Sequence, residues 1–138
     1  MARTSQSTAG LSINGPMKKW LFIAAVNGAL AVIAGALASH AQGLGPVAHA
    51  DIGLGASYQL SHAVAMALAA FAGRGKARAC ATVSAGLFLA GIVLFSGGLY
   101  ILSVTGTHAF AFMVPFGGVA FIAGWIALAV TALKWEGL

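Results

Sequence analysis

The sequence predicts an all-α integral membrane protein, built as a bundle of four transmembrane helices with both termini in the cytoplasm. Hydrophobic residues make up 60% of the 138 residues and charged residues only 7%, whereas a soluble domain carries about 25% charged residues. A chain with so little charge cannot cover a surface that faces water. The apolar residues form four runs long enough to cross a bilayer, and the basic residues flank these runs.

Residues 1–17 are rich in Ser, Thr and Gly, so we expect a flexible polar tail before a single membrane domain over residues 18–138. The first apolar run, 20–38, has 19 residues, close to the ~20 that cross ~30 Å of hydrocarbon. A cleaved signal peptide with its cleavage site at 36–38 is the alternative. Because the rest of the chain is also apolar, we expect a retained helix, in which Asn27 makes an interhelical hydrogen bond.

The remaining chain alternates between loops and apolar runs. Residues 39–55 hold four glycines, one proline and two histidines, a composition that predicts a loop. Short turns are expected at 73–78 and 105–108, where glycine and polar residues interrupt the apolar sequence. The second, third and fourth spans are therefore predicted at 56–72, 79–104 and 109–133.

Charge decides the expected orientation. An even number of spans places both termini on one side, and every Lys and Arg then falls on that side, as the positive-inside rule requires of the cytoplasm. We therefore expect a multi-pass protein of the inner (plasma) membrane with its amino and carboxyl termini inside. The seven basic residues are Arg3, Lys18, Lys19, Arg74, Lys76, Arg78 and Lys134.

Composition also excludes several functions. The net charge of +5 is divided into short groups beside apolar runs, which is not the pattern of a nucleic-acid-binding face. Cys80 is the only cysteine, so no disulfide within the chain and no paired-cysteine metal site can form. Asp51 and Glu136 are the only acids, which excludes hydrolysis by a carboxylate pair. No nucleotide, zinc-protease or hydrolase motif occurs, and we expect no enzyme, cofactor or metal.

One group of polar residues within the spans suggests a site. If the second span begins near residue 56, His62 lies ~9 Å along it, at the level that the end of the third span also reaches. Polar and ionisable groups inside a bilayer are costly and often functional. We therefore predict a polar pocket near the outer leaflet, formed by His40, Tyr58, Gln59, His62, Ser96 and Tyr100.

Each of these residues also has an ordinary structural explanation. Tyr58 and Tyr100 are typical anchors at a membrane interface, and His40 lies at the end of a span. His62 needs a partner, for which a structural hydrogen bond is favoured over a proton relay or a ligand-binding role. Metal or haem ligation is the weakest possibility, because no second histidine lies within a span.

Small residues are the other feature of the spans. Small residues four positions apart allow two membrane helices to approach closely, and Pro115 beside two glycines could bend the fourth span. The glycines expected to serve helix packing are Gly28, Gly35, Gly97, Gly117, Gly118 and Gly124.

Four segments together resemble the small bacterial YgdD/YwdK-type membrane proteins, a family of unknown function related to eukaryotic transmembrane protein 256. The segments are GALASHA (35–41), YQLSHAVAMAL (58–68), GIVLFSGGLY (91–100) and PFGGVAFIAGW (115–125). The family typically has Gly-Ala-His where this chain has Ala38-Ser39-His40, and often has Ser at the position of Gly98. The resemblance implies a four-span inner-membrane protein and brings no activity, substrate or cofactor.

The function expected from the sequence is therefore structural. We expect a non-enzymatic accessory protein that assembles or stabilises a membrane complex, with the lipid bilayer, a membrane-protein partner or a second copy of the chain in contact with its helices. The alternative is a small transporter or a lipid- or quinone-binding protein that uses the polar pocket around His62.

Overall fold

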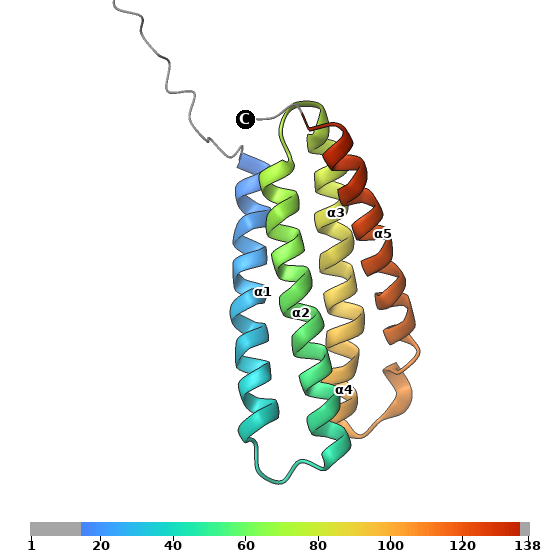
Figure 1. The fold of residues 1–138 in the computed structure, drawn as a ribbon. Helices are drawn as coiled ribbons and strands as arrows, with labels where there is room; N and C mark the ends of the chain where they lie inside the picture. The colour runs from blue at the N-terminus through green and yellow to red at the C-terminus, as the bar shows by residue number, and fades with distance from the viewer. Residues whose placement is uncertain (1–14, 136–138) are drawn as a thin grey trace, which may run out of the picture.

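The computed structural model describes residues 15–135 as four long helical segments that run up and down beside one another (Figure 1). The segments are α1 (Gly15–His40), α2 (Pro46–Ala72), a third formed by α3 (Arg78–Gly91), η2 (Ile92–Ser96) and α4 (Gly97–Thr105), and α5 (Met113–Leu133). A short 3₁₀ turn, η1 (Gly75–Ala77), lies between α2 and α3, and a second, η3 (His108–Phe110), lies between α4 and α5. The described residues contain no strand, and the predicted all-α four-helix bundle is confirmed. The polar tail expected over 1–17 lies largely outside these residues.

The loop expected over 39–55 is wrong in its second half. Helix α2 begins at Pro46, with the extended Gly45 before it, because proline has no N–H to leave unpaired in the first turn of a helix. Gly53 and Gly55 then lie inside the helix, where membrane helices tolerate glycine. Counted from Pro46, His62 lies ~24 Å along α2 rather than ~9 Å. The polar residues of α2 therefore lie near the middle of the bundle and not near one end.

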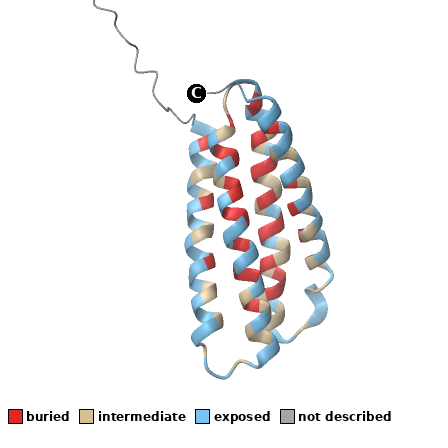
Figure 2. Cartoon of the chain, viewed as in Figure 1, coloured by how far each residue is buried: buried red, intermediate tan, exposed pale blue. Residues whose placement is uncertain are grey.

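Helix α2 is the centre of the packing. It lies between α1 and the third helical segment, and α5 packs along α3 on the far side (Figure 1). Buried residues are concentrated on α2 and α3, whereas α1 and α5 are largely exposed (Figure 2). The central hydrophobic cluster consists of Ala24, Ala65, Met66, Ala69, Ala85, Phe88, Ile92 and Phe121.

Length and composition allow three segments to cross a membrane: Gly15–His40, Gly75–Thr105 and His108–Leu133. Helix α2 is long enough but not apolar enough for this group, because of its polar residues. Many of its residues are buried among the other helices. Large apolar side chains cover the outside, and alanines fill much of the interior. Small residues at helix contacts and large apolar residues outside are typical of membrane bundles.

The third segment carries a π-helical turn in its middle. Within Ile92–Ser96 the helix widens, and the Gly97 N–H bonds to the Ile92 carbonyl, five residues back. Such wide turns occur mostly as single insertions in α-helices, often at functional sites. α3, before the turn, packs along α5, whereas α4, after it, keeps its contact with α2 and hardly touches α5.

Two glycine contacts join the third segment to its neighbours in the same way. The Ser84 hydroxyl donates to the Gly124 carbonyl of α5 at 2.9 Å, and the Ser96 hydroxyl donates to the Gly55 carbonyl of α2 at 2.8 Å. Four residues after each serine, an aromatic ring covers the same glycine: Phe88 over Gly124 and Tyr100 over Gly55. A Cβ on either glycine would lie 2.7 Å from a ring carbon, so both contacts require glycine.

Candidate functional site

The structure separates the six residues predicted to form one pocket. Tyr58 and Gln59 are neighbours in the sequence, and consecutive residues of an α-helix point about 100° apart. Gln59 faces α1 and α4. Tyr58 and His62 instead face α3, η2 and α5. His40 is exposed at the end of α1 and joins neither group. α2 thus carries two polar clusters on two of its faces.

The first cluster is a chain of side-chain amides and one phenol, which we call the amide chain (Asn27, Gln59, Tyr100). The Tyr100 hydroxyl donates to Gln59 Oε1 at 2.8 Å, and Gln59 Nε2 donates to Asn27 Oδ1 at 3.2 Å. Asn27 Nδ2 donates in turn to the Ile23 carbonyl at 2.9 Å. The chain joins α4, α2 and α1, and it includes the interhelical hydrogen bond expected of Asn27.

The two amides of the amide chain, Asn27 and Gln59, lie far from both ends of their helices, whereas Tyr100 reaches Gln59 from five residues before the end of α4. Gln59 is 13 residues from each end of α2, which is about 20 Å at 1.5 Å per residue. Asn27 has a similar position in α1. Water is absent from the hydrocarbon core, so polar groups at this depth depend on partners within the protein or on a ligand. Ser96 lies beside this cluster, with its hydroxyl bonded to Gly55.

The second cluster surrounds the imidazole of His62, and we call it the imidazole cluster (Tyr58, His62, Phe121, Trp125). His62 Nδ1 lies 2.7 Å from the Tyr58 carbonyl, and Trp125 Nε1 donates to His62 Nε2 at 3.2 Å. The ring stacks on Phe121, with centroids 3.6 Å apart and an interplanar angle of 12°. The Tyr58 ring stacks beside His62 with centroids 5.8 Å apart.

These partners define the protonation state of His62. A carbonyl oxygen can accept a hydrogen bond but cannot donate one, so Nδ1 must carry the proton that bonds to the Tyr58 carbonyl. Nε2 is then unprotonated and accepts the hydrogen bond from the indole N–H of Trp125. The imidazole is therefore neutral in this arrangement. To take up a second proton, Nε2 would have to release Trp125, since two N–H groups cannot bond to each other. The contact with Trp125 was not part of the sequence prediction, although Trp125 and His62 both lie near the middle of their helices.

Hydrogen bonds engage the polar side chains of both clusters. Within residues 15–135, no buried side-chain nitrogen or oxygen lacks a hydrogen-bond partner. In the same part of the chain, no group of three His, Cys, Asp or Glu side chains could hold a metal ion. Each buried polar side-chain atom described thus makes at least one hydrogen bond.

The glycines predicted to serve packing behave differently from one another. A Cβ on Gly117 would collide with the Phe95 backbone nitrogen, and one on Gly124 would meet the Phe88 ring. Gly35 and Gly97 make only ordinary contacts, and a Cβ on Gly28 or Gly118 would meet nothing within 4 Å. The prediction did not include the close approaches at Gly55, Gly73 and Gly91.

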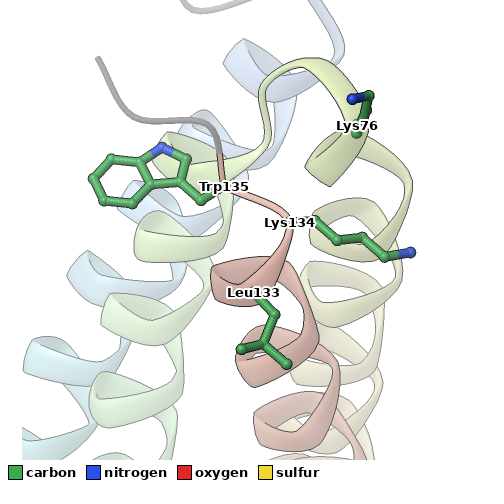
Figure 3. A pocket seen from close by; sticks show the side chains of 4 residues that line it. All are labelled: Lys76, Leu133, Lys134 and Trp135. Atoms are coloured by element: carbon green, nitrogen blue, oxygen red, sulfur yellow. The ribbon is translucent and has the colours of Figure 1, made fainter.

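Two hollows adjoin charged or polar residues. A groove of about 510 Å³ lies between α1 and the third segment, and the amide chain forms part of its lining; we call it the α1–α4 groove. A second hollow, of about 450 Å³, lies at the charged end of the bundle, which is the end that carries the described Lys and Arg residues. It is lined by Lys76, Leu133, Lys134 and Trp135 (Figure 3). The Lys134 ammonium and the Trp135 ring point to opposite sides there (Figure 3). Lysine beside tryptophan is typical of a membrane interface.

Comparison with known proteins identifies the family. A model described as "Protein of unknown function (DUF423)" matches residues 34–118. The chain belongs to the DUF423 family. The match begins in the second half of α1 and ends in the first turns of α5. It contains α2, the whole π-helical turn and the contact of Ser96 with Gly55, whereas Gly124, the partner of Ser84, lies beyond it.

Relatives of the DUF423 chain are membrane proteins. It is 39% identical over 122 residues to the UPF0382 membrane protein YwdK of Bacillus subtilis, an alignment that covers 86% of this chain and 99% of the relative. It is 34% identical over 116 residues to the UPF0382 inner membrane protein YgdD of Escherichia coli, covering 83% and 88% of the two chains. No solved structure matches the chain. The protein is therefore a membrane protein of a family whose function is unknown, as the resemblance implied.

Proposed function

We propose that this protein is a non-catalytic accessory protein of the inner membrane, which stabilises a larger membrane assembly. The observation that supports this proposal is the use of its interior polar groups. The amide chain and the two serine–glycine contacts all tie one helix to another. Such bonds are worth about 0.6 kcal/mol each in membrane bundles and together favour a rigid body over a moving one.

The alternative function, a transporter or binding protein with a pocket around His62, has less support. Such a pocket needs polar groups that converge on an open space. Both ring nitrogens of His62 are engaged by Tyr58 and Trp125, and the ring is covered by Phe121. Tyr100 and Gln59 point to another face of α2.

The surface for assembly is on the α1–α2 face. A shallow groove of about 220 Å³ there is lined mostly by small residues, among them Ala24, Ala25, Gly28, Ala63 and Ala67. Small residues allow the backbone of a second helix to come close, which is how membrane helices associate without a hydrophobic driving force. Helix α1 packs mainly on α2 and so has room for a second neighbour.

The experiment that tests assembly compares two glycines that both have open space where a side chain would be added. A Cβ on Gly28 or on Gly118 would meet nothing within 4 Å, so leucine at either position should leave the fold intact. We expect Gly28→Leu to release the protein from a larger complex extracted from native membranes in mild detergent. Gly118→Leu, on α5, should leave the complex unchanged. Recovery of wild-type protein only as a monomer would remove the basis for this proposal.

The proposed orientation places both termini in the cytoplasm. The start of α1, the α2–α3 turn and the end of α5 lie at the same end of the bundle (Figure 1), and all Lys and Arg residues among the described positions lie there. The opposite connections carry none. In a Cys80→Ala background, we expect Gln42→Cys to react with an impermeant maleimide in intact cells and Arg74→Cys to react only after lysis. The reverse pattern would overturn the orientation.

A further inference from the structure

The α1–α4 groove has the composition of a small-molecule site. Its volume of about 510 Å³ lies within the range of ligand pockets, which are mostly apolar with a few placed polar groups. Apolar side chains of α1 and the third segment form its walls. Asn27, Gln59, Ser96 and Tyr100 supply its polar lining, and no charged residue takes part.

The groove arises because α1 separates from the third segment along the bundle. At the charged end α1 approaches α3, where a Cβ on Gly86 would lie 3.7 Å from the Trp20 ring. Farther along, α1 packs on α2 and leaves α4 on the other side of the opening. The groove is thus closed toward the charged end and open to the membrane at its side.

The amide chain has hydrogen-bonding capacity left over. A side-chain amide has two N–H hydrogens, and the bonds described above use one from Gln59 and one from Asn27. Gln59 is only 5% exposed, and at this depth no water is present to accept its second hydrogen. A ligand with an acceptor oxygen would satisfy these donors.

Depth and charge narrow the ligand class. Gln59 lies about 20 Å from each end of α2, whereas the charged headgroups and ester groups of phospholipids lie outside the hydrocarbon core. An uncharged molecule can enter that core, and the uncharged lining of the groove favours one. Its head needs carbonyl oxygens for the amide hydrogens, and its tail must be apolar for the walls.

We propose that the α1–α4 groove binds a quinone-type lipid, with a ring carbonyl accepting a hydrogen bond from the amide chain. This site is distinct from the imidazole cluster, which faces another side of α2. Binding here does not depend on the proposed accessory role, since the assembly surface lies elsewhere on the α1–α2 face.

The test titrates detergent-solubilised full-length protein with decylubiquinone, following stoichiometry by native mass spectrometry and affinity by the rise in unfolding temperature. We expect saturable binding of one molecule. Gly97 lines the groove, and a Cβ there would meet only the Ile92 carbonyl at 3.9 Å, so Gly97→Leu should fold and abolish binding. Gly118→Leu is the matched control on α5 and should bind as the wild type does.

A second variant tests the hydrogen bond itself. Asn27→Leu keeps the approximate volume and removes a donor, so affinity should fall about tenfold. Decylbenzene, which has the tail without carbonyls, should not compete. Equal competition by decylbenzene, no saturable binding, or unchanged binding by Gly97→Leu would overturn the proposal. A phospholipid that copurifies with the wild type and is lost from Gly97→Leu would assign the groove to a phospholipid instead.

Discussion

Two adjacent glycines of α5 offer a direct test of the packing. A methyl group on Gly117 would collide with the backbone nitrogen of Phe95 and lie 2.7 Å from its Cβ, whereas one on Gly118 would meet nothing within 4 Å. Backbone atoms cannot rotate away, so α5 must shift from the third segment in Gly117→Ala. Gly118→Ala changes the same helix at the next position without this collision.

The expected magnitudes follow from two opposing effects. Alanine in place of a helical glycine stabilises by about 0.5–1 kcal/mol, and this gain applies to both variants. Overpacking costs about 1–3 kcal/mol and applies only to Gly117→Ala. The free energy of unfolding should therefore rise for Gly118→Ala and fall for Gly117→Ala, with a difference between them of about 1–3 kcal/mol.

Unfolding in mixed micelles with increasing dodecyl sulfate, followed by circular dichroism, measures this difference. Because both variants carry the same side chain in the same helix, their difference isolates the contact with Phe95. Equal changes in the free energy of unfolding for the two variants would refute the close approach of α5 to the third segment at Gly117.

Three further substitutions test the hydrogen bonds by the same unfolding measurement. Trp125→Phe keeps an aromatic ring beside His62 and removes the indole donor, so it should destabilise by about 0.6 kcal/mol; no loss would mean that the bond is not formed. A double-mutant cycle of Tyr100→Phe and Gln59→Leu should give a coupling energy of about 0.6–1.7 kcal/mol, and additive effects would contradict the amide chain. Ser96→Ala should lower stability by about 0.6 kcal/mol, with unchanged stability as the contrary result.

The helices were predictable because the membrane imposes a simple rule on their length and apolarity. The four apolar runs correspond in order to the four helical segments, and the charged turns lie where the sequence placed them. The start of α2 was not predictable from glycine and proline counts, since Pro46 begins a helix and Gly55 lies within one. Glycine in a membrane protein can serve a close contact between helices as well as a loop.

The sequence identified most of the polar residues of the two clusters, but it added His40, which joins neither cluster, and left out Trp125. Counting residues along helices gives a relative depth, and it placed Gln59 at the level of Tyr100, with which it is hydrogen-bonded. The expected position near the outer leaflet was wrong, because α2 begins at Pro46. The direction of each side chain around α2 depends on which neighbour it meets, and that is a property of the packed bundle. Trp125, the partner of the imidazole, was missed because the start of α2 was misplaced. Its depth matches that of His62 once α2 is counted from Pro46.

The π-helical turn accommodates one residue more in the third segment than a regular α-helix would hold between the same two ends. Each residue of an α-helix advances the direction of the following side chains by about 100°. A π-helical turn closes i→i+5 hydrogen bonds and so takes up one residue more than an α-helical turn. Deletion of one residue from Ile92–Ser96 would therefore restore a regular helix and leave α4 facing α2, with Tyr100 still over Gly55. The contact of Ser84 with Gly124 precedes the turn and would keep its place. The wide turn thus takes up the one residue by which this segment exceeds a regular α-helix with the same contacts at its two ends.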